Sequence, residues 1–256
     1  MRALEALGRL ILRILEQLGR FVQMLGRTAF WAVRPPFDLR ELLRQMVRVG
    51  WDSVPVVFLT MLFTGMVMAL QTYSGFARFH AEGFVGSVVA LSLTRELSPV
   101  LTALMVTGRV GSAMAAELGT MRVTEQIDAL TALATEPVQY LMVPRVLAAI
   151  AMLPLLVLMG DVVGMYGGYL VAVQLLGANP VTYIDNSFKY LTVADDVVSG
   201  LVKAAVFGLL FSLIACLRGY DTRGGAEGVG RATTSAVVTG SLAVLLSDFF
   251  LTKLLF

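Results

Sequence analysis

Five apolar stretches, each long enough to cross a lipid bilayer, constrain the fold of this chain more than any other feature. A helix needs about 20 mainly apolar residues to cross a hydrocarbon core about 30 Å thick. The stretches run from Val54 to Leu70, Phe84 to Thr107, Val143 to Val173, Val197 to Leu217 and Thr234 to Phe256. Hydrophobic residues make up 57% of the sequence and charged residues only 15%, and the mean hydropathy is +0.78. Because backbone polar groups in lipid must be satisfied internally, we predict an all-α integral membrane protein with about five transmembrane helices in residues 51–256.

The basic residues outside these stretches are strongly biased to one side of the membrane. Nine arginines precede the first stretch, three lie in residues 108–145 at the connection from the second to the third, and three lie between the fourth and fifth. The other two connections hold only Arg78 and Lys189. Since loops rich in arginine and lysine stay in the cytoplasm, we expect a cytoplasmic N-terminus and place Phe256 near the outer face. The arginine-rich start of the chain is not typical of a cleavable signal sequence.

Residues 1–50 carry the pattern of an amphipathic helical segment. Apolar residues recur at helical spacing, and arginines recur at intervals of seven or four. The residues that form the two faces are Leu4, Leu7, Ile11, Ile14, Leu18, Val22 and Leu25, and Arg2, Arg9, Arg13, Arg20 and Arg27. Such a helix can lie in the anionic headgroup layer, although packing against a partner subunit is an alternative. After Pro35 and Pro36, we expect a second short helix from Leu39 to Val49.

Chemistry based on a metal, a disulfide or a nucleotide is not expected of this chain. Cys216 and His80 are the only cysteine and histidine, so they provide neither a disulfide nor a metal cluster. None of the three lysines follows a glycine, as the phosphate-binding loop of ATPases requires. An intramembrane hydrolase built on Ser112 is disfavoured because His80 is expected on the opposite side of the membrane. We therefore expect no enzyme, no cofactor in this chain and no nucleic-acid partner.

A polar segment from Gly108 to Leu130 interrupts the apolar sequence between the second and third stretches. Its charged and apolar residues are mixed as in a short amphipathic helix, which would need an apolar groove to receive it. The candidate docking residues are Glu117, Met121, Arg122, Glu125, Gln126, Asp128 and Leu130. A solvated helix that only connects two spans is the alternative.

Several charged residues fall within the apolar stretches, beginning with Arg95 and Glu96 in the second. Each charge in hydrocarbon costs about a few kcal/mol unless it is paired or hydrated, so each is a functional hypothesis. Adjacent residues on a helix point about 100° apart, so Arg95 and Glu96 are not expected to pair with each other. The candidate partners are Asp161, Lys203 and Asp248, and Asp196, seven residues before Lys203 on the same helical face, completes the candidate charge network. The charges would either line a lipid cavity or form a structural network, and a Lys203 that extends outward is equally compatible.

A lipid cavity would also need apolar walls beside these charges. The candidate residues for the whole cavity are Phe63, Met66, Leu70, Tyr73 and Leu97 beside Arg95 and Glu96. Ordinary helix packing is the alternative for the apolar members. Gly160, Gly164 and Gly168 recur every four residues, which favours a close helix approach, either within the chain or between two copies.

Four segments of the sequence together resemble the MlaE-type permeases, the membrane subunits of ABC transporters that move lipids with MCE-domain proteins. The segments are MLFTGMV (Met61–Val67), ALSLTRELSPV (Ala90–Val100), EQIDAL (Glu125–Leu130) and GAEGVGRATT (Gly225–Thr234). The resemblance covers about residues 40–256, and the outer loops match only weakly. It therefore includes the whole predicted membrane domain.

The resemblance implies transport of phospholipid or a related lipid between a bacterial inner membrane and an extracytoplasmic MCE-domain carrier. A separate ATPase subunit would use ATP and Mg²⁺, and residues 115–130 would be the coupling helix that binds it. The resemblance also implies a homodimer with a central cavity and leaves room for a small cytoplasmic accessory protein. Two other functions remain open: an ion-coupled transporter that uses the intramembrane charges, and a membrane scaffold that transports nothing.

Overall fold

The computed structural model describes residues 2–35 and 38–255, and in that part of the chain all regular structure is helical. The α-helices are α1 (Arg2–Ala32), α2 (Leu39–Val49), α3 (Val54–Phe76), α4 (Val85–Ser92), α5 (Ser98–Val106), α6 (Ser112–Val123), α7 (Gln126–Ala132), α8 (Val143–Tyr169), α9 (Pro180–Lys189), α10 (Val198–Tyr220) and α11 (Gly225–Leu255). Short 3₁₀ turns are η1 (Trp51–Ser53), η2 (Ala77–Phe79) and η3 (Glu82–Phe84). The π-helical segments are η4 (Leu93–Leu97), η5 (Thr107–Gly111), η6 (Val138–Met142), η7 (Leu170–Leu175) and η8 (Val193–Val197).

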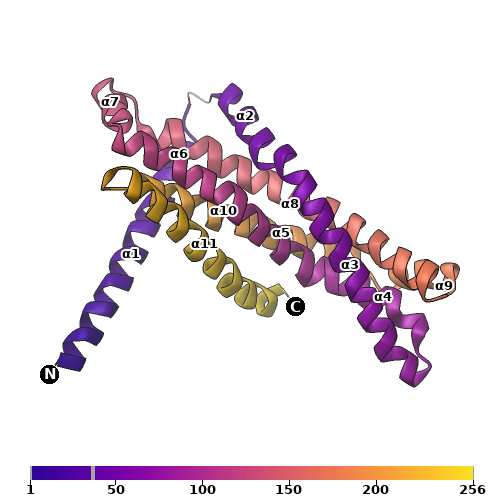
Figure 1. The fold of residues 1–256 in the computed structure, drawn as a ribbon. Coiled ribbons are helices and arrows are strands. Elements are labelled where there is room, and N and C mark those ends of the chain that lie inside the picture. Colours follow the sequence, from indigo (N-terminus) through magenta and orange to yellow (C-terminus); the bar gives the residue numbers. More distant parts are fainter. Residues whose placement is uncertain (1, 36–37, 256) are drawn as a thin grey trace.

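Five of the resulting helical runs are long and apolar enough to cross a membrane, which confirms the predicted all-α membrane fold. They extend over Leu39–Phe79, Glu82–Val123, Val138–Leu175, Val193–Tyr220 and Gly225–Leu255. The runs are longer than the apolar stretches because polar turns at their ends continue the same helices. The predicted short helix α2 is confirmed and leads through η1 directly into α3. At the two ends of the bundle lie α7 and α9 (Figure 1).

Helix α1 leaves the bundle, so that its N-terminal part projects away from the other helices (Figure 1). Near its C-terminal end, Met24 and Thr28 are buried, and Phe21 and Leu25 pack on a small apolar core. A stripe of exposed apolar side chains remains at Leu12, Leu15, Leu18 and Val22. The predicted face residues Arg2, Leu4, Leu7, Arg9, Ile11, Arg13 and Ile14 have no described side-chain surroundings, and Pro36 and Phe256 lie outside the described residues. The location of α1 in the headgroup layer stays a prediction.

The exposed arginine Arg20 ties α1 to the end of α10. It pairs with Glu16 one turn earlier at 2.7 Å and with Asp221, just after α10, at 3.3 Å. The hydrogen bond to Glu16 and the negative charge of Asp221 raise the pKa of the Arg20 guanidinium, so it stays charged at all physiological pH values.

The closest helix approach in the core joins α3 to α8. A Cβ atom added to Gly65 would lie 1.9 Å from the carbonyl oxygen of Gly164, so the two backbones are in direct contact. Gly160 faces Met61 and Ser98, and Gly168 faces Val89 and Tyr183. The glycines spaced every four residues therefore serve packing within the chain, and the alternative of a dimer interface at this stripe is wrong.

Gly65→Ala should destabilise the protein, because its methyl group would overlap the backbone of α8 and force the two helices apart. Overpacking of a tight core costs about 1–3 kcal/mol, and here the neighbour is backbone that cannot change rotamer. We expect a clear loss of melting temperature in detergent. Gly75→Ala on the same helix is the matched control, since nothing lies within 4 Å of its added Cβ. Equal melting of the two variants would contradict the α3–α8 contact.

Candidate functional site

A buried lysine, Lys203 on α10, organises the charges where η4, α10 and α11 meet. Its side chain is fully buried, and its Nζ atom donates hydrogen bonds to Glu96 Oε1 at 2.8 Å and to Thr252 Oγ1 at 2.8 Å. The same atom donates to the backbone carbonyl of Arg95 at 3.0 Å and lies 3.3 Å from Asp248 Oδ1. Lys203 therefore joins η4, α10 and α11, and the alternative of an outward-pointing Lys203 is wrong.

Arg95 forms the second half of this arrangement with Asp196. The Asp196 side chain is almost completely buried, and its Oδ1 accepts from Arg95 Nε at 2.6 Å. Its Oδ2 accepts from the backbone N–H of Thr192 at 2.6 Å, so both carboxylate oxygens are satisfied. We call the set Arg95, Glu96, Asp196, Lys203, Asp248 and Thr252 the Lys203 network. As expected, Arg95 and Glu96 each have a partner on another helix.

Two side chains of the Lys203 network, Arg95 and Glu96, are exposed on the surface of the chain. The side chains of Arg95 and Glu96 are 41% and 38% exposed, although both belong to a membrane span. They sit on the π-helical segment η4, and π-helical turns inside α-helices are frequent at functional sites. In a single copy of the chain, the charged side chains of Arg95 and Glu96 are therefore partly exposed within a span that would otherwise contact lipid.

Asp161, the remaining intramembrane acid, lies apart from these ion pairs. It is buried on α8, and its Oδ1 atom has no hydrogen-bond partner among the described residues. The neighbouring Gly160 faces Ser98 and Thr102 of α5. Asp161 is therefore placed in the packing between α5 and α8 rather than in the Lys203 network.

The predicted apolar wall residues on α3 do not gather around the charges. Met66 and Tyr73 pack on the main core, and the Tyr73 hydroxyl donates to the Leu176 carbonyl at 3.1 Å. Phe63 and Leu70 are exposed on the outer surface of α3. This helix packs mainly on α8 and α4, whereas the Lys203 network joins η4, η8, α10 and α11. Of the predicted wall residues, only Leu97, next to Glu96, shares an element with the network.

The polar segment between spans two and three is two helices rather than the single helix predicted from Ala115 to Leu130. Its first part, α6, is the end of span two and packs against α10 and α11. The chain then turns at Glu125, which has a left-handed φ of 60°, and continues as α7. Arg122 on α6 and Asp128 on α7 form an ion pair of 2.6 Å across the turn. Helical periodicity alone could not predict this break.

The exposed tip of this segment is α7 with its flanking turns. Glu125, Gln126 and Asp128 are exposed, and Leu133 just after α7 is 76% exposed. Met121 and Leu130 are only partly exposed because they pack on the smaller core beneath α1. The surface available to a soluble partner is therefore mainly acidic, with an exposed leucine at its end.

Glu117 on α6 is engaged within the chain. One carboxylate oxygen pairs with Arg48 of α2 at 2.7 Å, and the other pairs with Arg145 of α8 at 3.0 Å. Arg145 is buried, with only 7% of its side chain exposed. We call Glu117, Arg48 and Arg145 the Glu117 clamp. The sequence does not predict it, because Arg48 and Arg145 lie 69 and 28 positions from Glu117 and no local pattern links them.

A neighbouring set of contacts strengthens the link between α2 and span two. Arg109 donates to the Ser53 hydroxyl at 2.9 Å and to the Arg48 carbonyl at 3.2 Å, and lies 3.6 Å from Asp52. The start of span one is therefore fixed to η5 of span two by contacts of the Arg109 side chain with both side chains and backbone.

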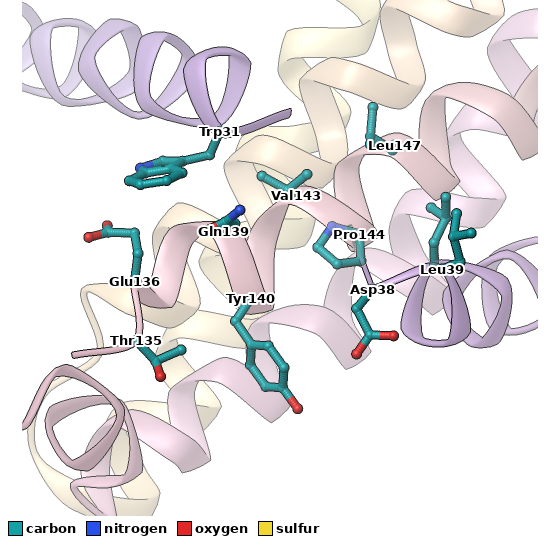
Figure 2. A pocket seen from close by; sticks show the side chains of 11 residues that line it. Trp31, Asp38, Leu39, Thr135, Glu136, Gln139, Tyr140, Val143, Pro144 and Leu147 are labelled. Carbon is teal, nitrogen blue, oxygen red and sulfur yellow. The ribbon is translucent and has the colours of Figure 1, made fainter. Parts of the chain in front are cut away.

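The chain also contains cavities away from the Lys203 network. One, of about 490 Å³, lies between the end of α1, the start of α2 and the η6–α8 segment (Figure 2). A second, of about 360 Å³, is lined by apolar residues of α2, η1, α3 and α8. Neither is lined by a residue of the Lys203 network.

Comparison with known proteins gives consistent matches along the chain. The family model described as "Permease MlaE" matches residues 42–254. A "Probable ABC transporter permease protein" of Rickettsia felis is 50% identical over 252 residues, which cover 98% of this chain and 97% of that protein. The "Intermembrane phospholipid transport system permease protein MlaE" of Haemophilus influenzae is 37% identical over 258 residues, covering 99% and 97%. "Protein TRIGALACTOSYLDIACYLGLYCEROL 1, chloroplastic" of Arabidopsis thaliana is 42% identical over 231 residues, covering 90% and 66%.

Proposed function

Since the chain belongs to the MlaE permease family, as its four motifs predicted, we propose that it moves phospholipid between the inner membrane and an extracytoplasmic MCE-domain carrier. It is the multi-pass permease subunit of an ABC transporter and not itself the ATPase. In this proposal a separate subunit hydrolyses ATP with Mg²⁺, and two copies of this chain form the pathway. A small cytoplasmic accessory protein could complete the complex.

The main support for a lipid pathway is the partial exposure of two charged side chains, Arg95 and Glu96. A charged side chain facing hydrocarbon is unfavourable by about a few kcal/mol, so this surface should face a hydrated cavity or another polypeptide. The apolar surface of α11 continues beside it, with Leu246, Phe249 and Phe250 strongly exposed. A second copy packed over this side would enclose polar groups and apolar walls together, which supports a homodimer with a central cavity.

The charges in such a cavity suit a phospholipid headgroup. Arg95 contacts Asp196 through both Nε and Nη2, and its side chain is still 41% exposed, so its positive charge can attract a phosphate at this surface. Glu96 contributes an exposed carboxylate that can accept from an ammonium or a hydroxyl. Lys203 is buried beneath both, so its role is to hold Glu96 and Asp248 in place rather than to bind lipid directly.

The coupling site is proposed at α7 and its flanking turns. The arginine bias of the loops places this end of the bundle in the cytoplasm, where an ATPase would be found. A short exposed helix joined rigidly to a membrane span can pass movement of a bound subunit into the bundle. The same bias puts α9 and the outer loops toward the periplasm, the side on which an MCE-domain carrier would dock.

Replacing Glu125 and Asp128 by arginine should uncouple ATP hydrolysis from lipid transfer, because the acidic surface of α7 would become basic. We expect at least about a tenfold loss of ATPase binding, as for several charge-reversed contacts at one interface. The measurement is binding of the purified ATPase to the permease in nanodiscs, with lipid transfer as the second readout.

Two controls separate docking from folding. Asp185→Arg reverses an exposed charge on α9 at the other end of the bundle and should leave ATPase binding unchanged. Glu125→Arg alone keeps the Arg122–Asp128 ion pair and should give an intermediate effect. Undiminished ATPase binding and transfer in the double variant would exclude α7 as the coupling site.

The whole proposal can be tested by gentle affinity purification from native membranes followed by mass spectrometry of bound proteins and lipids. Recovery of a P-loop ATPase, an MCE-domain protein and stoichiometric phospholipid is the expected result. The alternative, an ion-coupled transporter, rests on the Lys203 network acting as a proton relay. It would be favoured if the isolated chain moved substrate under an ion gradient with no ATPase bound.

A further inference from the structure

The cavity of about 490 Å³ has an apolar floor and a polar rim. Leu39, Leu42, Val143, Pro144 and Leu147 provide the floor. Trp31 of α1 lies on one side of the opening, facing Glu136 and Gln139, and Asp38 lies at the other side next to Pro144 (Figure 2). The end of α1, the start of α2 and the η6–α8 segment thus surround a single opening.

The second cavity follows the same pair of helices deeper into the membrane. Leu43, Met46 and Val47 line it on α2, and Met152, Leu155 and Met159 line it on α8. Along α8 the two linings together extend from Val143 to Met159, which is ~24 Å of helix axis. This length exceeds half of a hydrocarbon core about 30 Å thick, so the cavities follow one leaflet from its polar surface inward.

The rim carries charges of both signs that remain accessible. Glu136 Oε1 accepts from Arg27 at 3.1 Å, and Asp38 Oδ1 accepts from the backbone N–H of Glu41 at 3.1 Å. Among the described residues, no hydrogen bond to the second side-chain oxygen of either carboxylate is found. Gln139 donates to the Arg34 carbonyl at 3.2 Å, which fixes the end of α1 over η6. Arg27 is 56% exposed, so its guanidinium can also reach a phosphate.

We propose that this groove binds one phospholipid with an ammonium headgroup from the adjacent leaflet, at a site separate from the transport pathway. The ammonium has three N–H donors and would pair with Glu136 while the phosphate faces the neighbouring Arg27, and Asp38 adds negative charge at the other side of the opening. One acyl chain would follow the floor along Val143 and Leu147 toward the second cavity. Trp31 and Tyr140 stand at the depth where aromatic side chains favour the interface.

A lipid is favoured over a protein segment because the groove continues into a membrane-spanning region. The lining of the second cavity is almost entirely apolar, and its α8 residues lie within the span Val138–Leu175. A soluble peptide would have to bury unpaired backbone groups there, whereas an acyl chain has none. A lipid headgroup without a cation would leave the carboxylates of Asp38 and Glu136 unused.

The test uses the full chain in nanodiscs of equal phosphatidylethanolamine and phosphatidylglycerol, without ATPase. A photo-crosslinking benzoylphenylalanine replaces Leu147 in the cavity or, as matched control, Leu158 on the same helix. Leu158 is 43% exposed and lines neither cavity. We expect the ratio of ethanolamine to glycerol lipid adducts to be roughly three- to fivefold higher at position 147, as one partly exposed charge pair allows.

The double variant Asp38→Asn and Glu136→Gln should reduce this ratio at position 147 to the value at position 158. Equal ratios at the two positions in the parent chain would overturn headgroup recognition. Adducts at position 158 but none at position 147 would overturn the lipid site altogether. Because the assay contains no ATPase and measures no transfer, its result does not depend on the proposed transport function.

Discussion

Lys203→Met should abolish lipid transfer and markedly lower the melting temperature. The substitution removes the cation that lies between Glu96 and Asp248 and leaves two carboxylates facing each other within the membrane. Breaking a buried ion pair by removing one partner costs about 3–5 kcal/mol. The measurements are thermal unfolding in nanodiscs and phospholipid transfer in the reconstituted transporter.

A second variant separates stability from transport. Lys203→Met combined with Glu96→Gln and Asp248→Asn removes all three charges and should recover much of the lost melting temperature, because no unpaired charge remains. Transfer should stay low, since the exposed carboxylate of Glu96 is gone. Recovery of transfer together with stability would assign the network a purely structural role. Lys253→Met, an exposed lysine near the end of α11, should change neither quantity.

Glu117→Gln should lower both stability and the number of lipids moved per ATP. It leaves the buried guanidinium of Arg145 without its carboxylate and releases Arg48 of α2. Loss of a hydrogen bond between charged groups costs about 1.5–3 kcal/mol. Because Glu117 lies on α6, the helix that leads into α7, we expect movement at α7 to be passed less efficiently to spans one and three.

The readout for this variant is lipid transfer divided by ATP hydrolysis, measured on the same preparation. Glu227→Gln is the control, since its ion pair with Arg231 is exposed on both sides and should contribute little. A Glu117→Gln variant with reduced melting temperature but an unchanged ratio would show that the Glu117 clamp serves folding alone.

The membrane spans and α2 could be predicted because their signals are local. A run of about 20 apolar residues and a pair of prolines determine where helices begin and end without reference to the rest of the chain. Arg95 and Lys203 could be predicted as candidate functional residues in the same way, because a charge within an apolar stretch is unfavourable unless it is paired or hydrated. The four motifs extended this local information to the family.

The partners of these charges could not be predicted, because they depend on how each helix is rotated. Glu117 was assigned to an external partner from its place in a polar segment, yet it pairs with Arg48 and Arg145. The π-helical segments add to the difficulty, since each widened turn shifts the face of the residues that follow it. For Phe63 and Leu70 on α3, helical spacing does not say which neighbouring span the helix packs against, so their position relative to η4 could not be predicted.

The backbone contact between Gly65 and Gly164 divides the bundle into a part that can move and a part that cannot. Side chains at an ordinary interface can change rotamer and let two helices slide, but two backbones in contact have no such freedom. Spans one and three should therefore travel as one scaffold during a transport cycle. The last span, of which only 17% of its most apolar window is buried, has fewer contacts within the chain and should move more easily relative to this scaffold, with the Lys203 network holding one end.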